Sequence, residues 1–220
     1  MTEGTTIERI DYAGRRVLDV SLLPDSAWDS RAPQWWGNTL LILIESTTIL
    51  LLLVAYFYIR RNFGEWPPVQ SNTVPPLYHP VPDLLASTID LVLIVLSCIP
   101  MYLTDMAARR KDRKGVTIGL WLMFAVTLVL IGLRFWEFFG VHFRWDENAY
   151  GSIVWTILGT HLTYLLATSA EFLIMVLWVM RHGIDKKHGL DVTLAGGYWY
   201  WAAGTWVAIY AVVYWGARVL

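Results

Sequence analysis

The sequence is poor in cysteine and in charged residues. Cys98 is the one cysteine among 220 residues, so the chain offers neither a disulfide framework nor a cysteine-based metal site. Charged residues make up 16% of the chain, whereas an ordinary soluble domain carries about 25%. The formal net charge is −1, which excludes the basic surface that nucleic-acid binding requires. We therefore predict no nucleic-acid partner.

Motifs for the common catalytic and cofactor sites are also missing. The sequence contains no G-x-x-x-x-G-K-[ST] and no G-x-S-x-G pattern. Of its five histidines, only His161 lies within a long apolar run. A bis-histidine haem needs two facing histidines, and a zinc or copper site needs several His or Cys ligands. We expect no haem, metal or catalytic centre in this chain, which leaves open whether it is part of an enzyme.

Apolar residues, by contrast, make up 56% of the chain and gather into long runs. About 20 apolar residues in a helix span the hydrocarbon core of a membrane. We predict an all-α integral membrane bundle of five transmembrane helices within residues 35–220. Residues 1–34 form a polar segment without the apolar core of a signal peptide, and the proline-rich loop 65–82 is expected to be non-helical. The five runs cover residues 35–58, 84–103, 116–139, 152–180 and 198–217.

Basic residues are unevenly distributed between the loops. They are concentrated in residues 1–34 and in the loops after the second and fourth runs. By the positive-inside rule, the N-terminus is cytoplasmic and the C-terminus is periplasmic. The cluster after the second run is suited to anionic lipid headgroups, at about 1 kcal/mol per charge, although it could equally serve only to set topology. Its members are Arg109, Arg110, Lys111, Arg113 and Lys114.

Several ionisable residues interrupt the apolar runs. An ionised carboxylate at the position of Glu45, near the middle of the first run, costs roughly 2.5–3.5 kcal/mol. We therefore expect Glu45 to be largely protonated and to face His161 and Tyr164 of the fourth run. Arg134 and Glu137 are three residues apart and are expected to form an intramembrane ion pair. We predict that five residues form a buried ionisable site, unless they serve only as interhelical hydrogen bonds: Glu45, Asp90, His161, Tyr164 and Glu171.

The order and spacing of short motifs carry a family resemblance. Glu137 is followed by Tyr150-Gly151-Ser152 and then by Gly159 and His161. This series resembles the signature of subunit III of haem-copper oxidases, the cytochrome c oxidase subunit III family, in its five-helix bacterial form. Further similar blocks are Glu45 at the position of the family's carbodiimide-reactive Glu, Trp66-Pro67-Pro68, Asp112-Arg113-Lys114 and Tyr214-Trp215-Gly216.

The resemblance implies a non-catalytic subunit of a proton-pumping terminal oxidase in a bacterial inner membrane. Such a subunit packs against subunit I, binds phospholipid, and supports proton uptake and stability during turnover. Haem and copper are then expected in partner subunits. The five-helix form lacks the first two helices of the longer form, so the lipid-filled cleft that they border would be incomplete or completed by a neighbouring subunit.

The sequence also departs from the family pattern. Tyr164 stands where the family usually has a second histidine, and Asp90 stands where it has asparagine. In the last run, Tyr200 and Ala203 replace a histidine and an aspartate. The electron donor therefore stays open between cytochrome c and quinol. An accessory subunit of nitric oxide reductase and, more remotely, a small proton-coupled transporter are the alternative functions.

Overall fold

The structure, a computed structural model of the chain, is dominated by five long helices. They are α1 (Pro33–Arg60), α2 (Leu84–Arg109), α3 (Arg113–Gly140), α4 (Ala149–His182) and α5 (Lys186–Ile209). A π-helix, η1 (Tyr210–Trp215), and α6 (Gly216–Val219) follow α5, and an antiparallel hairpin of β1 (Glu8–Ile10) and β2 (Arg16–Leu18) precedes α1. The structure describes residues 8–10, 16–18, 32–69, 80–184 and 186–219, so most of the segment 1–34 and the centre of the loop 65–82 lie outside it.

Local sequence signals fix where the helices begin and end. Pro33 occupies the first turn of α1, where its missing N–H costs nothing. The side chain of Asp112 accepts a hydrogen bond from the Lys114 backbone N–H at the start of α3, and Asn148 accepts one from Gly151 at the start of α4. Gly183, with φ of 81°, follows the last residue of α4 in a conformation that favours glycine.

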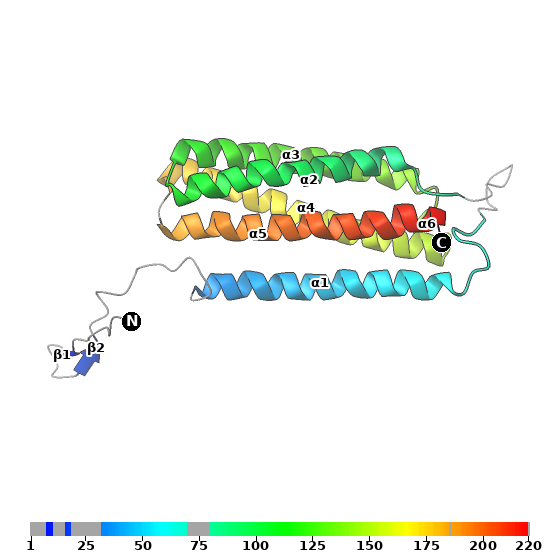
Figure 1. Cartoon of the computed structure of the whole chain (residues 1–220), viewed down its shortest axis with the longest axis horizontal. Coiled ribbons are helices and arrows are strands. Elements are labelled where there is room, and N and C mark those ends of the chain that lie inside the picture. Colours follow the sequence, from blue (N-terminus) through cyan, green and yellow to red (C-terminus); the bar gives the residue numbers. More distant parts are fainter. Residues whose placement is uncertain (1–7, 11–15, 19–31, 70–79, 185, 220) are drawn as a thin grey trace.

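Four of the helices close into a bundle, and the fifth lies beside it. α2 packs on α3, α3 on α4, α4 on α5, and α5 back on α2. α1 lies outside this ring and packs on α4 and α5 (Figure 1). Its buried residues are Ile49 and Tyr56. The chain therefore has a four-helix core with one peripheral helix.

Four helices of the bundle are candidate membrane spans by their length and composition. Among the described residues, α1, α2, α3 and α4 are long and apolar enough to cross a membrane. α5 is 24 residues long but is not apolar enough to be a candidate span, because it is rich in glycine, tyrosine and tryptophan. The expected fifth apolar run, 198–217, is therefore not a continuous α-helical span: the helix begins at Lys186 and gives way to η1 at Tyr210.

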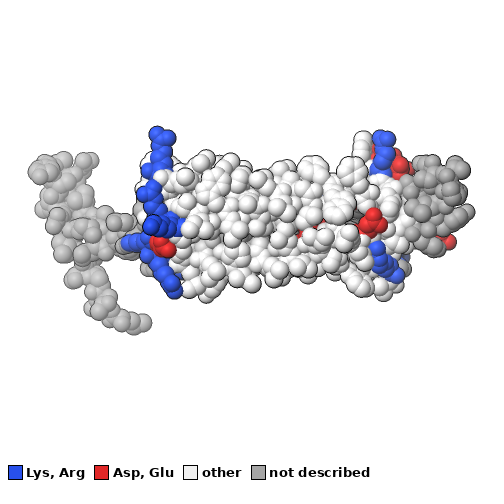
Figure 2. Space-filling model, turned by 90° about the horizontal axis from the view of Figure 1, so that it is seen from above, with Lys and Arg blue, Asp and Glu red and all other residues white. Residues whose placement is uncertain are grey.

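The charged side chains leave a wide band of the surface uncharged. Figure 2 shows lysine and arginine at the two ends of the bundle, with other residues covering the length between them. The exposed side chains of this middle region include Leu43, Leu50 and Val54 of α1 and Ile99 of α2. An apolar girdle between charged ends is the surface that a lipid bilayer covers.

An aromatic cluster attaches the end of α1 to the start of α4. The Trp66 indole N–H donates to the Tyr56 hydroxyl at 2.8 Å. The Trp66 ring also meets the Tyr150 ring edge-on, with centroids 4.8 Å apart. Tyr56 and Tyr150 are fully buried. The Trp66 that follows α1 therefore ties this peripheral helix to the four-helix core.

A glycine allows a close approach between α2 and α3. A Cβ atom added to Gly119 of α3 would lie 2.0 Å from the Thr104 Oγ1 of α2 and 2.9 Å from its Cβ. Small residues of this kind allow helices in membranes to approach closely. Gly132, further along the same helix, has no such neighbour within 4 Å.

We predict that Gly119→Ala lowers the free energy of unfolding by about 1–3 kcal/mol, because the added methyl group forces α2 away from α3. Gly132→Ala is the matched control, since it adds the same methyl group to the same helix in open space and removes the helix penalty of glycine. Thermal unfolding of the purified chain in detergent, followed by circular dichroism, measures both effects. Equal transition temperatures for the two variants would contradict this packing.

Candidate functional site

The most concentrated ionic chemistry lies inside the four-helix core. Arg134 of α3 contacts the Asp90 carboxylate of α2, with Nη2 and Oδ2 2.8 Å apart. Its Nη1 forms an ion pair with Glu137, one turn further along α3. Its Nη2 also lies 3.2 Å from Nδ1 of His161 on α4. Relative exposure is 0% for Asp90, Arg134 and His161 and 3% for Glu137, so we call these four residues the buried ionic cluster.

Aromatic residues of the last helices complete the surroundings of Arg134. The guanidinium carbon lies 3.5 Å from the ring centroid of Trp206 on α5, a cation–π contact. The Tyr214 hydroxyl of η1 donates to Oε2 of Glu137 at 3.3 Å. Arg134 therefore joins α2, α3, α4 and α5 through its own contacts, and η1 through Glu137.

The partners of His161 determine its protonation state. Its Nε2 lies 3.1 Å from the backbone carbonyl oxygen of Ala202, which only accepts hydrogen bonds. Its Nδ1 faces the Arg134 guanidinium, which only donates. His161 is therefore the neutral tautomer that carries its proton on Nε2. Because both ring nitrogens are engaged, neither is available to bind a metal.

Some polar atoms of the cluster and of the neighbouring Trp206 have no hydrogen-bond partner among the described residues. They are Oδ1 of Asp90, Nε of Arg134, Oε1 of Glu137 and Nε1 of Trp206. Each is buried, and buried polar groups are normally satisfied by protein or by ordered water. The buried ionic cluster thus retains capacity to donate and accept further hydrogen bonds.

Glu45 lies in a second polar site, at the contact between α1 and α5. The Tyr198 hydroxyl of α5 donates to Oε2 of Glu45 at 2.6 Å. One residue along α1, the Ser46 hydroxyl accepts a hydrogen bond from the Trp201 indole at 2.7 Å. Tyr164 reaches this site through its ring, whose centroid lies 5.3 Å from that of Trp201. Glu45 was expected to face His161 and Tyr164 of α4, but its hydrogen-bond partner is Tyr198 of α5. His161 points into the core towards Arg134 instead.

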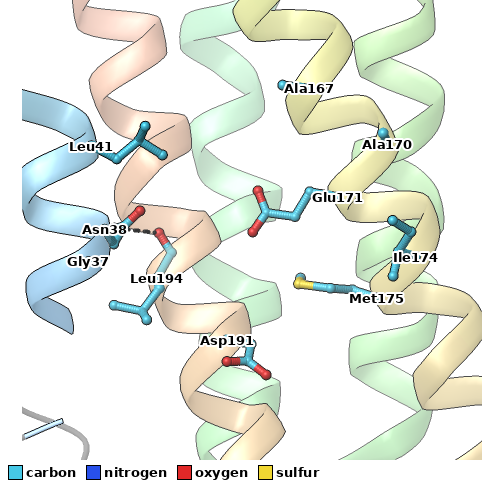
Figure 3. A pocket seen from close by; sticks show the side chains of 10 residues that line it. All are labelled: Gly37, Asn38, Leu41, Ala167, Ala170, Glu171, Ile174, Met175, Asp191 and Leu194. Carbon is cyan, nitrogen blue, oxygen red and sulfur yellow. Dashed lines mark hydrogen bonds between the residues drawn. The ribbon is translucent and has the colours of Figure 1, made fainter. Parts of the chain in front are cut away.

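Glu171 lies in a third place, a cleft of about 570 Å³ between α1, α4 and α5. Figure 3 shows the Glu171 and Asp191 carboxylates facing this cleft from α4 and α5, with Asn38 of α1 donating to the Leu194 carbonyl at 3.2 Å. Glu171 is exposed rather than buried. The five residues predicted to form one buried ionisable site therefore lie in three places. Asp90 and His161 lie together in the core, Glu45 and Tyr164 lie at the contact of α1 with α5, and Glu171 lies at the cleft.

The basic cluster after α2 divides into two kinds of residue. Arg109 pairs with Asp105 at 2.9 Å, and Arg113 donates to the Met180 carbonyl of α4 at 2.5 Å. The Arg109 pair lies within α2, whereas Arg113 links the start of α3 to the end of α4. Arg110, Lys111 and Lys114 are exposed. Arg109 and Arg113 are exposed as well, so all five positive charges of the cluster lie at the surface.

Sequence reasoning missed the link between Asp90 and Arg134, since the two residues are far apart in the chain. It also missed Tyr198, Trp206 and Tyr214 as partners of the ionisable residues. The available signal was the spacing of aromatic residues in the last apolar run: Tyr210 and Tyr214 are four apart and stack, with centroids 5.6 Å apart. Such spacing marks one helix face, but it does not indicate which acid that face meets.

In the part of the chain that the structure describes, no group of three or more His, Cys, Asp and Glu side chains is arranged to hold a metal ion. The ionisable residues of the helices instead pair with arginine, tyrosine or backbone groups, as the contacts of Asp90, Glu45 and His161 show. Their chemistry is that of hydrogen bonding and charge neutralisation.

Fold and site together define a helical membrane protein with a buried ionic cluster, and its family follows from comparison with known proteins. The family model for cytochrome c oxidase subunit III matches residues 31–218. The chain therefore belongs to the cytochrome c oxidase subunit III family. This result confirms the resemblance found in the sequence motifs.

Individual relatives agree with this assignment at low identity. Cytochrome c oxidase subunit 3 of Thermostichus vulcanus is 21% identical over 163 residues, which cover 73% of this chain and 76% of the relative. The subunit 3 of Alkalihalophilus pseudofirmus is 24% identical over 141 residues, covering 60% and 68%. That of Balaenoptera musculus is 20% identical over 152 residues, covering 69% and 56%. The relatives include bacterial proteins and a longer animal one.

We predict that Arg134→Met destabilises the folded chain by about 3–5 kcal/mol, because it leaves two buried carboxylates without their cation. Arg144→Met is the control. Arg144 pairs with Asp146 at 3.1 Å, but the two side chains are 70% and 42% exposed, so its loss is expected to change stability by at most about 1 kcal/mol. Thermal unfolding in detergent compares the two. Similar stabilities would show that Arg134 does not neutralise the cluster.

Proposed function

We propose that the chain is the non-catalytic subunit III of a proton-pumping haem-copper terminal oxidase in a bacterial inner membrane. The observation that carries this proposal is the family match over residues 31–218, which includes α1 to α5. In this role the chain packs against subunit I and other oxidase subunits. Haem and copper belong to those partners. In this chain both ring nitrogens of His161 already contact Arg134 and the Ala202 carbonyl oxygen, so this histidine is not free to bind a haem or a metal.

The proposed membrane arrangement has five spans, with the N-terminus in the cytoplasm and the C-terminus in the periplasm. α5 supports the fifth span because it packs along α2 and α4 within the bundle (Figure 1). Trp199 and Trp206 on it are fully buried. A helix that is enclosed by other helices needs less apolar character than one that faces lipid. The basic residues at the α2–α3 connection support the cytoplasmic assignment of that end.

The proposed contribution to the oxidase is support of proton uptake and of stability during turnover. Glu45 is the residue of α1 placed for this role, as a protonated carboxyl held by Tyr198. α1 presents the exposed residues Leu43, Leu50 and Val54 along its outer surface. This peripheral helix is therefore suited to contact with subunit I or with lipid.

Removal of the chain tests the proposed role in the complex. A tagged chain is expected to co-purify with a haem- and copper-containing subunit I. An oxidase prepared without the chain is expected to keep its initial oxygen consumption but to lose activity sooner during sustained turnover, with slower proton uptake. Oxygen-electrode traces and pH-indicator measurements compare the two preparations. Co-purification with a nitric oxide reductase, or isolation without any redox partner, would contradict the proposal.

Phospholipid binding at residues 109–114 is the second part of the proposal. We predict that Arg110→Gln combined with Lys111→Gln weakens binding to anionic vesicles by about 1 kcal/mol per removed charge. Arg60→Gln combined with Arg61→Gln removes the same charge at the opposite end and is the matched control. Flotation of the purified complex with anionic and neutral vesicles measures the difference. Equal losses in both double variants would assign the cluster to topology alone.

A further inference from the structure

The buried ionic cluster contains more acid than base. Asp90 and Glu137 each carry a negative charge when ionised, whereas Arg134 supplies a single positive charge. His161 is held neutral between the Arg134 guanidinium and the Ala202 carbonyl oxygen. The cluster would therefore carry one uncompensated negative charge in the membrane interior, which is strongly unfavourable.

The other groups that face the cluster do not supply the missing positive charge. From η1, Tyr214 presents a neutral hydroxyl that donates to Glu137. From α5, Trp206 presents its ring face. Arg218 of α6, which directly follows η1, donates instead to the carbonyl oxygens of Tyr214 and Pro82 at 2.5 Å. Neutrality therefore requires a proton.

A cleft at the end of the bundle reaches Glu137 of the cluster. It has a volume of about 320 Å³ between α2 and α3, and Glu137, Ala86, Trp136 and Asp83 are among its lining residues. Oε1 of Glu137 is buried and has no hydrogen-bond partner in the described structure. Asp83, one of the lining residues, has its Oδ1 3.3 Å from Nε2 of His142, and both side chains are partly exposed. Asp90, by contrast, is fully buried and does not line the cleft.

We propose that Asp90 and Glu137 hold one proton between them, and that this proton exchanges with solvent at Oε1 of Glu137 through the cleft beneath Asp83 and His142. One O–H bond forms at the carboxyl group and the proton comes from water, so the cluster becomes neutral and no other bond changes. The site is a proton-binding site of this chain itself. It rests on the contacts of the cluster, whichever oxidase the chain serves.

Infrared spectroscopy of the full-length chain tests whether the proton is held. The background carries Glu45→Gln and Glu171→Gln, which remove the other carboxyl groups of the apolar runs. At neutral pH this protein is expected to show the carbonyl band of a protonated carboxylic acid. The band should vanish in Glu137→Gln and equally in Asp90→Asn, because either change leaves one carboxylate neutralised by Arg134. Asp83→Asn is the control and should retain it.

Absence of the band from the background protein would overturn the proposal. So would its survival in either cluster variant, since that result would describe an acid protonated on its own rather than a shared proton. Thermal unfolding of each variant shows whether a lost band reflects a lost fold. If a cluster variant does not fold, the background protein alone still decides whether an exchangeable protonated acid is present.

The exchange route has a separate test. In D₂O the band should shift to lower frequency as the proton is replaced by deuterium. Ala86→Leu, which narrows the cleft, should slow that shift. Ala167→Leu adds the same group to the Glu171 cleft between α1, α4 and α5 and should leave the rate unchanged. Equal rates in the two variants would exclude the cleft beneath Asp83 as the route.

Discussion

A buried positive charge needs its counter-charges close by, and in this chain that requirement organises the bundle. Arg134 lies on α3, and its partners come from all four helices of the core. Its counter-charges are on α2 and α3, a histidine nitrogen contacts it from α4, and a tryptophan ring contacts it from α5. In the apolar interior of a membrane, each of these contacts is difficult to exchange for another. The guanidinium therefore fixes how the four helices of the core are rotated towards one another. Close packing, as at Gly119 and Thr104, then fixes how near they lie.

The same constraint separates the ionisable residues into distinct environments. The side chains of the core meet arginine and backbone groups, whereas Glu45 meets a tyrosine at the contact with a peripheral helix. Glu171 borders a cleft in contact with the exterior. The carboxylates inside the core are thus paired with an arginine, whereas those outside it meet a tyrosine hydroxyl or a cleft open to the exterior. Membership of the cytochrome c oxidase subunit III family places this arrangement within a multi-subunit complex.

Much of the fold follows from the sequence, because apolar length and turn chemistry are local. The runs that begin at residues 35, 84, 116 and 152 fall within α1 to α4, and Asn148 and Gly183 mark the ends of α4. The last run is different. Its tryptophans and tyrosines satisfy partners on other helices, so neither the start of α5 at Lys186 nor the π-helical turn at Tyr210 has a local signal.

The candidate site was less accessible to sequence reasoning, since pairing across helices depends on their rotation. The Arg134–Glu137 spacing is local and predicts the contact between them. Asp90 is assigned to the same place only once α2 lies against α3. For Glu45 the sequence favoured His161, but that histidine is on the side of α4 that faces Arg134. Residue spacing identifies which side chains share one face of a helix. Which residues of other helices that face contacts depends on how the whole bundle packs.

The way in which α1 is attached has a mechanical consequence. Its contacts with the core along the helix are made by side chains such as Asn38, Glu45 and Ser46, and the Trp66 cluster holds only the end near Tyr56. In lipid, polar contacts of this kind contribute only about 0.6 kcal/mol each. These polar contacts fix the position of α1 along the core, but they contribute little to the free energy that holds it there. α1 is therefore tied most firmly to the core at its Trp66 end, and its other end can separate from α5 at a lower cost in free energy.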